Sequence, residues 1–180
     1  MDESVPFAGK WYFGMLALLV FARGMDFLST WVATPNLVLE GNPFAKKLGW
    51  KWGLPVNAVM CGVLALWPFS AIVVATASVL VAARNFQSAW LMQSLGEHSY
   101  RDWHVERIQH TPISVYLACL AGNTLLTAAV GGAMILFSHR LLIPLAIGMG
   151  IVAYAVAVAF YTLLAIWRMR RLTKTSPPDI

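Results

Sequence analysis

An apolar run extends from Leu54 to Ala83 without a single Asp, Glu, Lys, Arg or His. A helix needs only about 20 apolar residues to cross a hydrocarbon core of about 30 Å. Three further apolar runs with few charges occupy residues of about 11–34, 113–137 and 141–167. We therefore predict an all-α polytopic membrane protein, with about four transmembrane helices in a bundle that forms a single domain over residues 1–180.

The composition indicates lipid, and not water, as the surrounding solvent. Hydrophobic residues make up 59% of the chain and charged residues 12%, whereas soluble domains carry about 25% charged residues. The formal net charge is +5, and the basic residues stand at the ends of the apolar runs, as is typical of membrane proteins. We expect the lipid bilayer as a partner, and no nucleic acid.

Pro68 interrupts the longest apolar run. A proline inside a helix removes one backbone hydrogen bond and kinks the helix. Neither half of the run is long enough to span alone, so we predict one kinked helix that extends as far as Leu95. The polar segment from Glu97 to Gln109 extends this helix or forms a short surface helix, in which Glu97 and Arg101 pair at i, i+4.

The distribution of lysine and arginine predicts an orientation, because cytoplasmic loops are enriched in these residues. With four spans, the basic residues of one side are only Lys46, Lys47, Lys51 and Arg140, and the other side carries more. We therefore predict both termini in the cytoplasm, an outer loop over residues 35–53, a cytoplasmic loop over 84–112 and a disordered tail over 172–180. Residues 138–140 should form a tight turn between antiparallel helices.

Small residues four positions apart predict where helices approach each other closely in lipid. Three such pairs stand out in the last two spans: Ala118 and Gly122, Ala128 and Gly132, and Ala146 and Gly150. They indicate packing within the bundle or contact with another subunit.

Arg23 and Asp26 lie inside the first apolar run. Charges at membrane depth cost several kcal/mol, so they form pairs or face a wet cavity. Two interpretations stay open: a structural ion pair at i, i+3, or a site for a substrate, an ion or a lipid headgroup.

Other polar residues fall at compatible depths. At a rise of 1.5 Å per residue, Asp26 lies about 22 Å from Trp11 along the helix, and Thr30 lies one turn further out. We predict one outward-facing polar cavity with binding residues Arg23, Asp26, Thr30, Glu40, Asn42, Asn57 and Asn123. Its two carboxylates, Asp26 and Glu40, are the candidates for catalytic residues.

Asp26, Thr30 and the segment Glu40-Gly41-Asn42-Pro43 form a pattern: an aspartate followed by a threonine in the first span, then a Glu-x-Asn-Pro loop. In this pattern the chain resembles a small uncharacterised family of prokaryotic membrane proteins, over roughly the first third of its length. The resemblance implies a bacterial inner membrane and a site at these residues. It implies no reaction, because the function of that family is unknown.

The polar segment after the second span holds weak candidates for a metal site: His98, Asp102 and His104. His98 and Asp102 share a helical face at i, i+4, but the H-E-x-x-H pattern is absent. A solvated interfacial segment is the alternative interpretation. Cys61 and Cys119 lie in separate apolar runs, so we expect neither a disulfide nor a zinc site. No cofactor follows from the sequence.

No nucleophile elbow, Walker loop or dinucleotide fingerprint occurs in the chain. Three functions stay open. The first is an accessory subunit or a binder of lipid or partner, in contact with other membrane subunits or with copies of itself. The second is an intramembrane enzyme that acts on a lipid or lipid-linked substrate, with Asp26 and Glu40 as acid and base or as cation ligands, and Arg23 on a phosphate. The third is a proton-coupled carrier with Asp26 as the coupling carboxylate.

Overall fold

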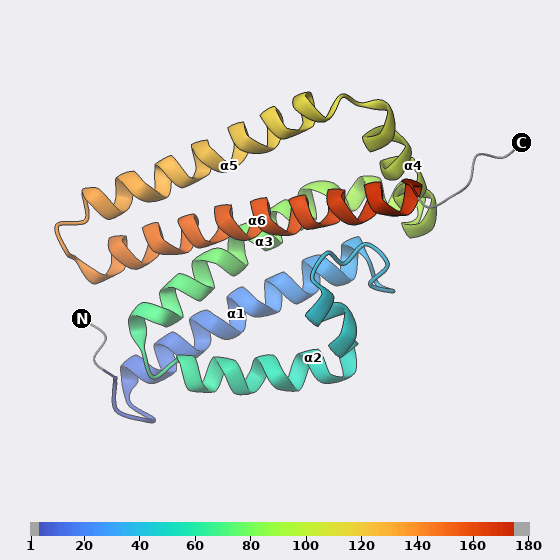
Figure 1. Ribbon diagram of the computed structural model, residues 1–180. Helices are drawn as coiled ribbons and strands as arrows, with labels where there is room; N and C mark the ends of the chain where they lie inside the picture. The colour runs from blue at the N-terminus through green and yellow to red at the C-terminus, as the bar shows by residue number, and fades with distance from the viewer. Residues whose placement is uncertain (1–3, 175–180) are drawn as a thin grey trace, which may run out of the picture.

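The computed structural model describes residues 4–174, which are helical apart from short connections (Figure 1). The helices are α1 (Lys10–Ala33), α2 (Pro43–Leu64), α3 (Pro68–Leu95), α4 (Glu97–His110), α5 (Ile113–Leu136) and α6 (Leu142–Lys174). Four of them are long and apolar enough to cross a membrane: α1, α3, α5 and the part of α6 up to Arg168. The predicted all-α membrane bundle with four such helices is confirmed.

The prediction of one kinked helix over residues 54–83 is wrong, because the chain reverses direction before Pro68. α2 ends at Leu64, and α3 begins with Pro68 in its first turn. A proline at this position loses nothing, since the first backbone N–H groups of a helix have no intrahelical partner. It also forces the preceding residue out of the helical region, and Trp67 is extended, with φ −117° and ψ 97°. The predicted end at Leu95 is confirmed, and Gly96 separates α3 from α4.

α1 and α3 run in the same direction. Arg23 on α1 donates to Ser78 on α3, and further along both helices Asn85 donates to Thr30. Beyond that, Gln93 donates to the backbone carbonyl of Val32. The residue numbers of the contacts therefore increase in the same direction along both helices, as expected of parallel helices.

α2 is broken at Gly49, where φ is 60° and ψ −171°, and its second part runs antiparallel to α1. Tyr12 near the start of α1 donates to the Gly62 carbonyl, whereas Arg23 donates to Asn57. α2 is therefore a fifth pass through the bundle, joining the parallel helices α1 and α3. It is less apolar than a typical span because its first turns carry Lys46 and Lys47.

Five passes place the two ends of the described chain at opposite ends of the bundle (Figure 1). This arrangement does not support the prediction of both termini on one side. The loop after α1 lies beside the start of α4, where the Glu97 carboxylate accepts a hydrogen bond from Thr34 Oγ1 at 3.2 Å. The predicted outer loop 35–53 and cytoplasmic loop 84–112 thus share one end of the bundle. We call it the cavity end, because residues of both segments line the cavity described below.

Helices α5 and α6 form the predicted tight hairpin around residues 138–140. They approach each other closely at Gly131 and Gly148, where an added Cβ would lie 2.8 Å and 2.7 Å from the backbone oxygen of the other glycine. Of the predicted small-residue pairs, the pair on α6 makes a helix contact: Ala146 is fully buried, and Gly150 packs against Thr76 of α3. Gly122 and Gly132 face open space, so the two predicted pairs on α5 do not mark its contact with α6, which lies at Gly131 instead.

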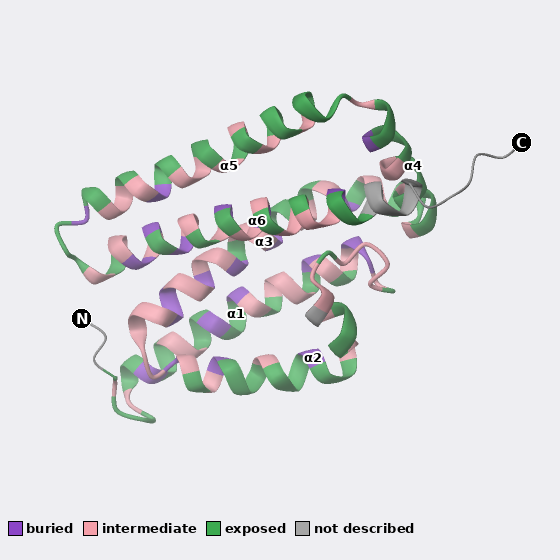
Figure 2. Ribbon diagram, in the orientation of Figure 1, coloured by how far each residue is buried: buried purple, intermediate pink, exposed green. Residues whose placement is uncertain are grey.

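The buried core lies between α1, α2 and α3 and consists of small and apolar residues. It includes Leu19, Ala22, Cys61, Ala71 and Ala75. Large apolar side chains are exposed on the outer surfaces of the helices, as expected of a lipid-facing exterior, and α5 is exposed along most of its length (Figure 2). Both cysteines are free, which confirms the expectation of no disulfide. α6 continues to Lys174, and the rest of the predicted tail, 175–180, lies outside the described residues.

Candidate functional site

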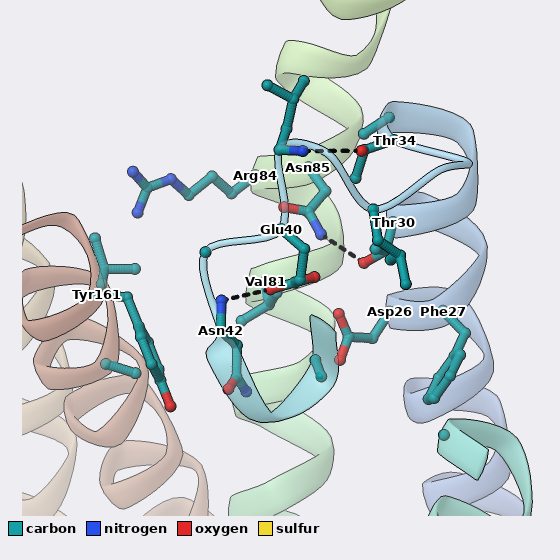
Figure 3. Close-up of a pocket in the computed structure, with 18 of the residues that line it drawn as sticks. Asp26, Phe27, Thr30, Thr34, Glu40, Asn42, Val81, Arg84, Asn85 and Tyr161 are labelled. Atoms are coloured by element: carbon teal, nitrogen blue, oxygen red, sulfur yellow. Dashed lines mark hydrogen bonds between the residues drawn. The ribbon is translucent and has the colours of Figure 1, made fainter. Parts of the chain in front are cut away.

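A cavity of about 1000 Å³ opens at the cavity end of the bundle. Its walls come from all six helices and the loop after α1, with α5 contributing Tyr116 near its start; Figure 3 shows part of its polar wall. Six of the seven predicted binding residues line it, namely Arg23, Asp26, Thr30, Glu40, Asn42 and Asn57. The cavity also has apolar walls, to which Leu19, Phe27, Met60 and Val74 contribute.

Asn123 does not line the cavity. It lies exposed on α5, a helix that packs against α6 and not against α1. The depth argument could not say which helices are neighbours or which face of α5 carries the residue. α5 reaches the cavity only near its start, where Tyr116 lines it.

Arg23 is held by three helices. Its Nε and Nη2 donate to Asn57 Oδ1 of α2 at 2.8 Å and 2.6 Å. Its Nη1 donates to Asp26 Oδ2 at 2.7 Å and to Ser78 Oγ of α3 at 3.1 Å. The ion pair with Asp26 is the only one among the side chains that the structure describes, and the two side chains are 28% and 15% exposed. The predicted structural pair is present, and four of the five N–H donors of Arg23 are directed at protein acceptors.

Asp26 and Glu40 point toward one another across the cavity (Figure 3). Asp26 Oδ2 faces Arg23, while Glu40 Oε1 accepts the backbone N–H of Asn42 at 2.7 Å. The Glu-x-Asn-Pro segment is therefore a turn in which Glu40 is fixed by the backbone two residues later and Pro43 begins α2. The two carboxylates have different partners, and like-charge repulsion acts between them.

Asn85 completes the polar wall on α3. Its Nδ2 donates to Thr30 Oγ1 at 3.2 Å and to Ser29 Oγ at 3.3 Å. Ser29 in turn donates to the Asp26 carbonyl at 2.8 Å. Asn85 thus fixes the α1 turn that carries Asp26, and sequence reasoning missed it because the run was interpreted as ending at Ala83.

Glu97 anchors the loop above the cavity. Its carboxylate accepts the Asn36 backbone N–H at 2.9 Å, the Val38 backbone N–H at 3.3 Å and the Thr34 hydroxyl. Trp50 Nε1 holds the same loop by donating to the Pro35 carbonyl at 2.9 Å. The predicted Glu97–Arg101 ion pair is wrong, because Glu97 turns to the loop.

Glu97→Ala should release this loop. Each hydrogen bond to a charged group contributes about 1.5 kcal/mol or more, so the Asn36 and Val38 amides should exchange with deuterium about tenfold faster. Exchange followed by mass spectrometry on detergent-solubilised protein measures this. Glu106→Ala, on the exposed face of α4, is the matched control. Unchanged protection of residues 34–39 would contradict the anchoring role.

Three arginines line the cavity that were not predicted as site residues: Arg84 of α3, Arg101 of α4 and Arg168 of α6. All three are exposed, and none has a carboxylate partner among the described residues. Arg84 points away from Asp26 and Glu40 (Figure 3). In the sequence these arginines are ordinary basic residues that flank the apolar runs. Their spacing along the chain does not show that residues of three helices line one cavity.

α4 contributes two aromatic side chains to the cavity, Tyr100 and His104, which stack with ring centroids 5.8 Å apart. Burial raises the pKa of the Tyr100 phenol, with a smaller contribution from Tyr116. Burial lowers the pKa of the His104 imidazole. Both groups therefore favour their neutral, hydrogen-bonding forms at neutral pH.

The weak metal candidates do not come together. His104 lines the cavity, whereas His98 and Asp102 are exposed and do not. Among the described residues, no group of three or more His, Cys, Asp or Glu side chains is placed to hold a metal ion.

Comparisons with family models, curated proteins and solved structures find no match to this chain. The function must therefore be argued from the site.

Proposed function

We propose that this membrane protein binds the polar headgroup of an amphiphile, a lipid or lipid-linked molecule, in the cavity between α1, α3 and α6. The observation that carries the proposal is the pair of facing carboxylates, Asp26 and Glu40, in a cavity that also has apolar walls. An amphiphile offers both surfaces that such a cavity needs: polar groups for the carboxylates and hydrocarbon for the apolar wall.

The carboxylates define what the headgroup must carry. Ionised carboxylates only accept hydrogen bonds, so they favour ligands with hydroxyl or ammonium groups. Asp26 keeps one oxygen on Arg23, and Glu40 keeps one on Asn42. The second oxygen of each carboxylate is therefore available for a ligand that enters between them.

The charge distribution supports access from the cytoplasmic leaflet. Of the 13 lysines and arginines, the chain segments of the cavity end contain Lys46, Lys47, Lys51, Arg84, Arg101, Arg107, Arg168, Arg170, Arg171 and Lys174. The opposite end has Lys10 and Arg140. By the enrichment of basic residues on the cytoplasmic side, the cavity faces the cytoplasm and the N-terminus the other compartment. This reverses the outward-facing cavity expected from a four-span layout.

Glu40→Gln tests the proposal. The amide keeps an oxygen for the Asn42 N–H but loses the charge, so ligand retention should fall about tenfold, the loss of one charge-assisted hydrogen bond. Native mass spectrometry of protein purified in a mild detergent measures the fraction carrying a bound lipid. Glu106→Gln is the matched control. Equal lipid occupancy in both variants, or a stable complex with other polypeptides and no bound lipid, would count against a lipid site and favour an accessory subunit.

An intramembrane enzyme is the second candidate, and the unequal partners of the two carboxylates favour it. Acid–base chemistry needs two titratable groups whose environments differ, and Asp26 lies beside a cation whereas Glu40 lies beside a backbone N–H. Conversion of a labelled lipid by reconstituted protein, lost in Glu40→Gln, would support this activity.

A further inference from the structure

We propose that Arg84, Arg101 and Arg168 form the anion-binding half of the site and hold a phosphate group of the ligand. The inference rests on the proposed function, which assigns the carboxylate half, and adds the chemical class of the ligand. The ligand is then a phosphate-bearing amphiphile that carries hydroxyl or ammonium groups on the far side of its phosphate.

Three positively charged side chains line the same cavity. The three arginines come from three helices, α3, α4 and α6, and all line the same space. Among the described side chains none of them is neutralised by a carboxylate, because the single ion pair there belongs to Arg23 and Asp26. Three like charges repel one another, so an anion in the cavity would relieve an interaction that the protein leaves uncompensated.

Arg23 and Arg84 differ in how far their N–H donors are already used by the protein. Arg23 is a poorer phosphate ligand, because four of its five N–H groups already donate to Asn57, Asp26 and Ser78. Arg84 has no such partners, and its side chain extends away from the carboxylates (Figure 3). The phosphate position is thus separated from Asp26 and Glu40, whose charges would oppose it.

The side chains of this part of the cavity wall offer hydrogen-bond donors that suit a phosphate. A guanidinium presents a planar fork of N–H donors that matches the oxygens of a phosphate. The phenols of Tyr100 and Tyr161 line the same cavity and supply neutral donors. A phosphodiester with a terminal hydroxyl or amine, such as phosphatidylglycerol or phosphatidylethanolamine, carries one group for each half of the site.

The experiment titrates phosphatidylglycerol into the detergent-solubilised protein and counts bound lipid by native mass spectrometry. Each of Arg84→Gln, Arg101→Gln and Arg168→Gln should weaken binding about three- to tenfold, and the triple variant at least about thirtyfold. The control triple variant Lys47→Gln, Arg107→Gln, Arg140→Gln removes the same charge outside the cavity and should stay within about twofold of the unmodified protein. Matching elution on size exclusion shows that the variants fold, and the single variants replace the triple variant if it does not.

The outcomes separate the two proposals. Equal binding by the two triple variants overturns the arginine assignment, while the carboxylate site stands if Glu40→Gln still weakens lipid binding. Inorganic phosphate, titrated alone, distinguishes the source of the anion. Arginine-dependent phosphate binding without lipid binding keeps the arginine site and overturns the amphiphile as its ligand. No binding of either probe overturns both proposals.

Discussion

Arg23→Met is expected to prevent accumulation of stably folded protein. The substitution keeps an apolar stem but removes every donor to Asn57, Asp26 and Ser78, which tie α2 and α3 to α1. It also leaves the Asp26 carboxylate unpaired at 15% exposure. Breaking such a pair from one side costs about 3–5 kcal/mol, a large part of a typical stability of about 5–15 kcal/mol. Thermal unfolding in detergent, followed by circular dichroism, measures the loss.

A second substitution separates the charge from the packing. Arg23→Met combined with Asp26→Leu removes both charges, so much of the lost stability should return, since no uncompensated carboxylate remains. Arg84→Met is the matched control, because Arg84 holds no helix in place by a hydrogen bond within the described part of the chain. An unfolding temperature for Arg23→Met equal to that of Arg84→Met would show that the network does not stabilise the bundle.

Cysteine labelling should show an all-or-none separation of the two ends of the bundle. In a background with Cys61→Ala and Cys119→Ser, a membrane-impermeant maleimide should reach Lys47→Cys and Gln109→Cys from the cytoplasmic side only. It should reach Phe7→Cys and Arg140→Cys from the opposite side only. All four positions are exposed. The physical reason is the fifth pass, α2, which brings residue 47 to the same end as α4.

The four-span layout groups the four labelled positions differently, so the two layouts predict different labelling patterns. That layout pairs residue 47 with residue 140 and residue 7 with residue 109. Intact spheroplasts and inverted vesicles from the same cells supply the two accessible sides, and detergent-permeabilised membranes show that each cysteine can react. Labelling of Lys47→Cys together with Arg140→Cys would overturn the five-pass arrangement.

The cavity residues were predictable to different degrees. Arg23, Asp26 and Glu40 stood out because a charge in or beside an apolar run is costly and therefore has a partner or a role. Glu97 and Arg84 did not stand out, because charges outside the apolar runs are ordinary. Their positions follow from α3 running parallel to α1, which brings the ends of both helices together. Asn123 shows the converse error: it was expected in the cavity from its depth along the helix, but it is exposed on α5, and Tyr116 is the α5 residue that lines the cavity.

The sequence by itself determined that the chain is helical, enters lipid and carries two opposite charges three residues apart within its first span. These properties follow from local terms: the hydropathy of each run, the length that a helix needs to cross the bilayer, and the cost of an isolated charge. The boundaries of α5 and the hairpin before α6 followed from the same terms.

Only the tertiary structure decided the number of passes, the side on which each loop lies and the membership of the cavity. Pro68 is compatible both with a kink and with the start of a new helix, and the two readings differ in the direction of every later helix. The packing of α2 against α1, through Tyr12 with Gly62 and Arg23 with Asn57, settles the choice. Contacts between residues 34 and 50 positions apart lie beyond what hydropathy and local spacing can encode.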